Sequence, residues 1–134
     1  MGIISWRSEY KIGNQQVDSQ HQHLLDLTNK LFETSSHKEV LKNIEILHAY
    51  TILHYKEEEA LMKGCNYPNY LPHKKDHDLL LKQMNDFIEQ LKDGRKEVEE
   101  IKPFIGMWLL DHVFGADAKF GEFYAHHRMM CKND

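Results

Sequence analysis

The stretch KEVLKNIEILHAYTILHYKEEEALMK, residues 38–63, decides the fold of this chain. Its inward positions recur at steps of three and four, as in an amphipathic helix, and they are Val40, Ile44, Leu47, Thr51 and Leu61. His54 and Glu58 fall on the same face, one helical turn apart, and Gly64 follows as a predicted C-terminal cap. The stretch therefore predicts a long helix that carries a histidine and a carboxylate into the interior.

Three other segments show the same helical periodicity. Together with the first stretch, helices are expected at about residues 18–34, 38–63, 72–92 and 103–124. Asp18 is the predicted N-terminal cap of the first helix, and Pro72 and Pro103 are expected near the start of the last two. Since no segment alternates with period two and the connections are short, we predict an all-α, antiparallel up-down-up-down four-helix bundle.

The composition supports one domain, residues 1–134, with residues 1–16 as an N-terminal arm laid against the bundle. The net charge of −4 gives no basic surface for nucleic acid or anionic lipid, so neither is an expected partner. The start lacks a signal-peptide pattern, and no apolar run approaches the ~20 residues that span a membrane. Cys65 and Cys131 are two lone cysteines that suit free thiols in a reducing compartment. A cytoplasmic protein is therefore expected.

Histidine is unusually frequent, with ten residues, and half of these fall on inward helical positions. They are His21, His54, His73, His77 and His112. Glu58 also points inward, whereas Asp117 follows His112 by five residues, about 140° around an ideal helix. Asp117 faces inward only if the helix is locally distorted, which Gly115 makes easier. Any one of these histidines alone is more often a hydrogen-bonded core residue.

The joint pattern favours metal, because burying five imidazoles and two carboxylates without partners costs several kcal/mol for each unsatisfied group. Imidazole and carboxylate ligands suit iron, copper, nickel or zinc. One zinc ion would have too many ligands. Two six-coordinate ions would use all seven side chains and one bridging oxygen, and would leave a single position open.

Four motifs in this order resemble the hemerythrin family, specifically the bacterial hemerythrins: VDSQHQHLL around His21, HYKEEEALM with His54 and Glu58, HKKDH with His73 and His77, and WLLDHVFGAD with His112 and Asp117. The resemblance covers nearly the whole chain. It implies two iron ions with an oxo or hydroxo bridge, one bound by His73, His77 and His112 and the other by His21 and His54. It also implies that both carboxylates bridge the irons, with dioxygen taking the open place on the two-histidine iron.

Reversible dioxygen binding, for oxygen carriage, storage or delivery, is the function this resemblance implies, and no enzyme activity is expected. Leu24, Trp108 and Leu109 lie within a helical turn of His21 and His112, so we expect them to form the wall of the oxygen pocket or simply to pack in the core. Three alternatives stay open: an oxygen or redox sensor acting through a partner protein, a diiron enzyme reducing oxygen, peroxide or nitric oxide, and an iron store.

Overall fold

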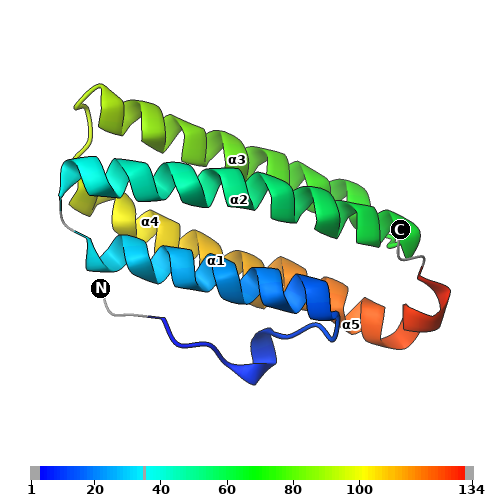
Figure 1. The fold of residues 1–134 in the computed structure, drawn as a ribbon. Helices are drawn as coiled ribbons and strands as arrows, with labels where there is room; N and C mark the ends of the chain where they lie inside the picture. Colours follow the sequence, from blue (N-terminus) through cyan, green and yellow to red (C-terminus); the bar gives the residue numbers. More distant parts are fainter. Residues whose placement is uncertain (1–3, 35, 132–134) are drawn as a thin grey trace.

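The computed structural model describes residues 4–34 and 36–131, apart from the side chains of Val113 and Phe114. Four long helical rods run antiparallel to their sequence neighbours (Figure 1). They are α1 (Gln15–Glu33), α2 (His37–Gly64), α3 (Tyr70–Lys92) and a fourth rod made of α4 (Val98–Asp111), a π-helical segment (His112–Asp117) and α5 (Ala118–His127). The predicted all-α up-down-up-down bundle is confirmed.

The first helix begins earlier than predicted, at Gln15, and Asp18 is not its cap. The side chain of Asn14 caps it by accepting a hydrogen bond of 3.0 Å from the backbone N–H of Val17. The carboxylate of Asp18 instead accepts hydrogen bonds from the backbone N–H groups of Ile12 and Gly13, at 2.7 and 3.2 Å. Asp18 therefore fixes the direction from which the N-terminal arm enters the bundle.

The fourth rod also begins upstream of its predicted start. Its apolar face already includes Val98 and Ile101, both buried, so the helix forms before Pro103 and contains that proline. At the end of α2, Gly64 is the last helical residue, and the left-handed position belongs to Asn66, with φ 55°. At the start of α4, burial of these apolar residues outweighs the preference of proline for the first turn.

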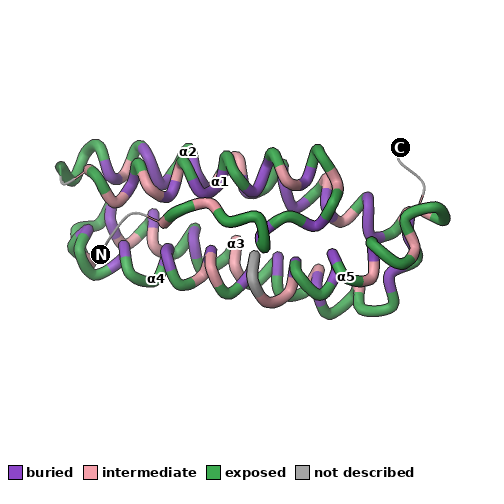
Figure 2. The backbone as a smooth tube through the Cα atoms, turned by 90° about the horizontal axis from the view of Figure 1, so that it is seen from below, coloured by how far each residue is buried: buried purple, intermediate pink, exposed green. Residues whose placement is uncertain are grey.

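The N-terminal arm crosses the outside of the bundle from residue 4 onward (Figure 2), as predicted. Residues 1–3 lie outside the described part of the chain. Asn29 on α1 holds the arm, because its side chain accepts from the N–H of Ile4 at 2.8 Å and donates to the Ile4 carbonyl at 2.7 Å. Tyr10 and Ile12 are buried. A Cβ at Gly121 would lie 2.7 Å from Cγ2 of Ile12, so α5 needs glycine where the arm crosses it.

Two apolar clusters fill the bundle, one toward each end. The larger cluster includes Leu24, Leu47, Met84 and Leu109, and the smaller one includes Phe120 and Cys65. Buried residues face the space between the rods along their whole length in Figure 2. The buried histidines and carboxylates lie on the helices between these two clusters, so the fold places a polar layer inside an apolar core.

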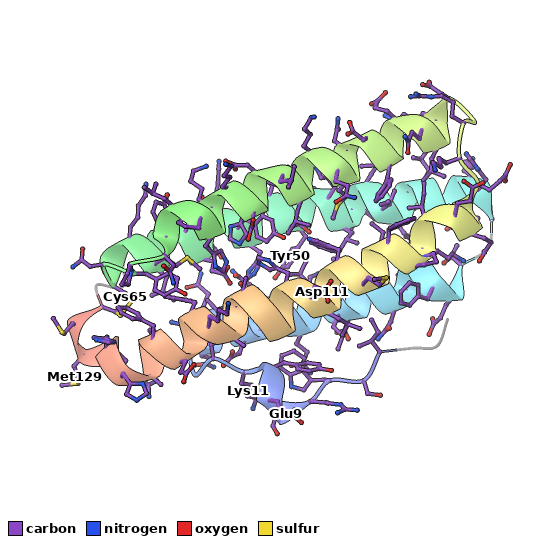
Figure 3. All side chains as sticks on the ribbon, turned by 180° about the vertical axis from the view of Figure 1, so that it is seen from behind. Glu9, Lys11, Tyr50, Cys65, Asp111 and Met129 are labelled. Atoms are coloured by element: carbon purple, nitrogen blue, oxygen red, sulfur yellow. A yellow bond between two sulfur atoms is a disulfide. The ribbon has the colours of Figure 1, made fainter. Side chains whose placement is uncertain are left out.

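The prediction that both cysteines are free thiols is wrong. Cys65, just after α2, and Cys131, after α5, form a disulfide with an S–S distance of 2.02 Å. Cys65 lies at the end of the bundle where the C-terminal segment turns back (Figure 3). The cytoplasmic location thus loses one of its arguments and stays a prediction. Within the described ranges, no helix combines the length and the apolar character needed to cross a membrane.

Candidate metal centre

All seven residues predicted as metal ligands meet in the polar layer between the two apolar clusters. Each rod supplies at least one of them, and none is more than 7% exposed. They are His21 from α1, His54 and Glu58 from α2, His73 and His77 from α3, and His112 and Asp117 from the π-helical segment. Side chains that are distant in sequence therefore form a single buried cluster.

The π-helical segment explains how Asp117 joins this cluster. In an α-helix, residues five apart point in different directions, but a π-helix pairs residue i with residue i+5. Here the π-helix spans His112–Asp117, and both end residues are buried. The local distortion named as a condition for an inward Asp117 is thus present, and it includes Gly115.

The cluster divides into two groups that share the carboxylates. Glu58 Oε1 lies 3.1 Å from Nε2 of both His73 and His77, whereas its Oε2 lies 3.4 Å from Nε2 of both His21 and His54. Each carboxylate oxygen therefore serves a different group of histidines.

Asp117 repeats this arrangement. Its Oδ1 lies 3.1 Å from His73 Nε2 and 3.0 Å from His112 Nε2, while its Oδ2 lies 2.9 Å from His21 Nε2. The result is one group with three histidines and one with two, joined by both carboxylates. The resemblance to hemerythrins implied the same division, and sequence spacing alone did not.

The electrostatics of these groups are strongly coupled. Burial lowers the pKa of His21, but the carboxylates of Asp117 and Glu58 outweigh burial and raise this pKa to about 10. The pKa of His112 is also about 10, for the same reasons. Burial raises the pKa of Glu58, yet the close imidazoles of the surrounding histidines hold this pKa well below its usual range. The cluster thus keeps its carboxylates ionised and demands positive charge beside them.

The protein's own groups do not satisfy the hydrogen-bonding capacity of these histidines and carboxylates. Among the described residues, both ring nitrogens of His21, Nε2 of His54, Oε2 of Glu58 and both carboxylate oxygens of Asp117 are buried without a hydrogen bond of normal geometry. Native proteins rarely leave so many buried polar atoms together unpaired. Imidazole nitrogens and carboxylate oxygens are ligands of transition-metal cations, so the residues present fit a metal centre.

Two residues that sequence reasoning missed orient the histidines from behind. His54 Nδ1 lies 2.7 Å from Oε1 of Gln20, whose amide N–H₂ donates to Glu57, and His77 Nδ1 lies 2.7 Å from Oε2 of Glu59. A hydrogen bond at Nδ1 fixes the ring so that Nε2 faces the cluster. The sequence did hold one signal for these two residues, because each is adjacent to a predicted ligand: Gln20 precedes His21, and Glu59 follows Glu58.

Tyr55 is the third missed residue. Its ring stacks on the ring of His77 at a centroid distance of 3.6 Å and an interplanar angle of 4°, and it also contacts His54 and His112. Burial raises the pKa of the Tyr55 hydroxyl well above its usual value, so this group stays protonated. Tyr55 therefore supports the histidines as a flat, neutral wall.

The residues expected to form an oxygen pocket are within about one helical turn of proposed ligands in the sequence. Leu24 and Leu109 are each 2% exposed and belong to the larger apolar cluster, against which the half-buried Trp108 packs. This burial suits both core packing and a pocket wall, so their role in oxygen binding stays a prediction.

An antiparallel four-helix bundle with histidines and shared carboxylates at its centre defines a class of metal-binding bundle. Residues 13–124 match the family described as Hemerythrin HHE cation binding domain. The chain belongs to the hemerythrin family.

Known relatives extend over most of the chain. A bacteriohemerythrin from Pseudomonas aeruginosa is 28% identical, covering 94% of this chain and 84% of that protein. A hemerythrin-like protein from Naegleria gruberi is 32% identical, covering 87% of this chain and 90% of that protein. A crystal structure of wild-type hemerythrin superposes with a TM-score of 0.82 at 28% identity, covering 90% of this chain and 97% of that chain.

Proposed function

We propose that the chain binds dioxygen reversibly at a carboxylate-bridged, non-haem diiron centre, for oxygen carriage, storage or delivery. In this proposal His73, His77 and His112 would hold one iron ion, and His21 and His54 would hold the other. Glu58 and Asp117 would each offer one carboxylate oxygen to each ion. Membership of the hemerythrin family supports the choice of iron and of dioxygen.

One observation carries the proposal. Each of the two buried carboxylates directs one oxygen toward the three-histidine group and the other toward the two-histidine group. A single ion would need only one group, whereas two carboxylates set between two groups of imidazoles fit a bridged pair. The smaller group contributes fewer protein ligands, which supports placing the open coordination position there.

The chain's own residues would keep such a centre dry and ordered. When bound, the iron pair supplies the redox chemistry that lets dioxygen bind reversibly. The two apolar clusters on either side exclude bulk water, and we assign Leu24, Trp108 and Leu109 to the wall around the open position. Gln20 and Glu59 hold the Nε2 atoms of His54 and His77 toward the cluster.

Metal analysis of the purified protein tests the centre itself. We expect about two iron ions per chain, since seven protein ligands overfill one ion. The variant His77→Ala should lose iron, whereas His126→Ala, which changes an exposed histidine on α5, should retain it. A single zinc ion at full occupancy, or equal iron content in both variants, would contradict the proposed centre.

Stopped-flow mixing of the reduced, iron-loaded protein with oxygen tests reversibility. We expect a new absorption band to form quickly and the starting spectrum to return when oxygen is removed. Steady consumption of peroxide or nitric oxide in the presence of a reductant would favour an enzyme instead. A spectrum that responds to redox state without reversible oxygen binding would favour a sensor that acts through a partner protein.

A further inference from the structure

Beyond α5 lies a short segment in which no residue is buried. Arg128–Met130 form a single 3₁₀ turn, and contacts at both of its ends hold this turn to the rest of the protein. At its start, the guanidinium of Arg128 donates a hydrogen bond of 2.8 Å to the Gly13 carbonyl. Just after it, Cys131 is joined to Cys65 by the disulfide. The disulfide is therefore the covalent anchor of a segment that burial does little to hold.

The two cysteines of this disulfide have different surroundings. Cys65 is 4% exposed, its N–H donates a hydrogen bond of 3.0 Å to the Leu61 carbonyl at the end of α2, and it packs in the smaller apolar cluster with Tyr67 and Phe120. Cys131 is half-buried and packs against the outside of that cluster. A thiolate that approaches from solvent therefore reaches the sulfur of Cys131 first.

This asymmetry lets the disulfide open without unfolding of the bundle. A disulfide between two buried elements is shielded until the protein unfolds, whereas segments with few buried contacts open locally at low cost in free energy. Here one sulfur belongs to the fixed end of α2 and the other follows a turn that buries no residue. Exposed disulfides are also the labile and regulatory ones.

We propose that Cys65 and Cys131 form a reversible thiol–disulfide exchange site that latches the C-terminal segment to the bundle. Its reaction partner is a dithiol, and the attack falls on Cys131. The site consists of side chains outside the metal cluster, so the exchange requires neither iron nor oxygen.

The exchange proceeds in two balanced steps. A thiolate of the dithiol attacks Sγ of Cys131, a mixed disulfide forms there, and Cys65 leaves with the electron pair of the broken S–S bond and takes up a proton. The second thiolate of the dithiol then attacks the mixed disulfide, and Cys131 leaves and is protonated. Two electrons and two protons have passed from the dithiol, which is now a disulfide, to the two cysteines.

Opening of the latch frees the segment beyond Arg128. Met129, which is 96% exposed and points away from the bundle in Figure 3, then moves together with Cys131. The hydrogen bond from Arg128 to Gly13 remains as the hinge, and α5 stays in place because Phe120 is fully buried. The position of the segment therefore reports whether the surroundings favour thiols or disulfides.

Reduced glutathione tests where the disulfide is attacked. The folded protein, with and without iron, is mixed with glutathione, free thiols are blocked with N-ethylmaleimide, and the products are mapped by mass spectrometry. We expect glutathione on Cys131 and the maleimide on Cys65, with at least about tenfold preference over the reverse pattern. The rate should rise in proportion to the glutathione concentration. Equal labelling of both cysteines, or a rate that levels off at the rate of global unfolding, would overturn the proposal.

Limited digestion with trypsin tests the latch itself. Cleavage of the bond between Arg128 and Met129 should be at least about tenfold faster after reduction with dithiothreitol, because the freed segment can enter the protease. Products are separated under reducing conditions, so that tethered fragments are counted. Cleavage after Arg95, which is exposed between α3 and α4, is the internal control and should change far less. Global destabilisation would instead speed both cleavages equally.

A variant and a reversal complete the experiment. Cys131→Ser should be cleaved after Arg128 at the fast rate with or without dithiothreitol. Treatment of the reduced parent protein with glutathione disulfide should restore the slow rate. Equal cleavage of the oxidised and reduced parent, or reduction that cannot be reversed, would refute the latch. Because the metal-free protein should give the same results, failure of the oxygen experiment would leave them unchanged.

Discussion

At the scale of single residues, the hydrogen bonds behind the histidines have the clearest consequences. His77 receives a carboxylate at Nδ1, from Glu59, whereas His54 receives a neutral amide, from Gln20. A carboxylate partner makes an imidazole a stronger metal ligand than an amide does. The two histidine groups are therefore unequal even before the number of histidines is considered.

The first prediction concerns Glu59. The variant Glu59→Gln keeps the shape of the side chain but removes its charge, so the affinity for iron should fall about 10- to 100-fold. Competition with a chelator measures this affinity. Glu45→Gln, at an exposed position on the same helix, is the control and should behave as the parent protein does. Equal loss of iron from both variants would show that Glu59 does not position His77.

The second prediction concerns Leu109, which is 2% exposed and precedes His112 by one helical turn. Leu109→Ala should cost about 2 to 5 kcal/mol of folding free energy and open a cavity beside the cluster. All seven proposed ligands remain, so the iron content should be unchanged. Water entering the cavity should shorten the lifetime of the oxygenated absorption band in air. A lifetime no shorter than that of the parent would remove Leu109 from the pocket wall.

At the scale of elements, two local features place the fourth rod. The π-helical segment turns Asp117 inward, and the glycine of α5 lets the N-terminal arm lie directly against the helix. Arg128, beyond α5, adds a hydrogen bond of 2.8 Å from its guanidinium to the Gly13 carbonyl. The arm thus contacts the fourth rod at Gly121 and again beyond α5, at Arg128.

The third prediction compares two glycines of this rod. Gly121→Ala places a methyl group against Ile12, including its backbone, and should destabilise the protein by about 1 to 3 kcal/mol. Gly115→Ala meets no atom within 4 Å, so it should be neutral or stabilise by up to about 1 kcal/mol. Urea denaturation of the metal-free proteins measures both changes. If both variants were equally stable, the contact between arm and α5 would carry no stability.

At the scale of the whole molecule, the disulfide ties the end of the chain to the loop between α2 and α3. The two cysteines are 66 residues apart in sequence, and the segment between them contains His73, His77, His112 and Asp117. Cross-linking so long a segment reduces the conformational entropy of the unfolded chain. Its main effect therefore falls on global stability, with the cluster remaining assembled by packing.

The fourth prediction concerns the disulfide that closes this 66-residue segment. Replacing both cysteines, Cys65→Ser with Cys131→Ser, should lower the free energy of unfolding by up to about 4 kcal/mol. Denaturation of the parent protein with a reductant present should show the same loss, whereas the double variant should not respond to reductant. Iron content at low temperature should be retained in both cases. A parent protein equally stable with and without reductant would show that the disulfide contributes nothing in solution.

The sequence by itself determined the helical rods and six of the seven inward residues. Periodicity at steps of three and four depends only on neighbours along one helix, so the inward positions of His54 and Glu58 follow from local sequence. The fold class follows too, because short connections between helices permit few arrangements. The starts of α1 and α4 were misplaced because cap preferences are weak beside the burial of residues such as Val98.

Only the tertiary structure decided which atoms meet. Asp117 needed a π-helix, the pairs Gln20–His54 and Glu59–His77 needed the relative rotation of separate helices, and the cysteines met across a long stretch of chain. Contacts of this kind depend on the register between helices, which packing of the whole core sets and which no local pattern encodes.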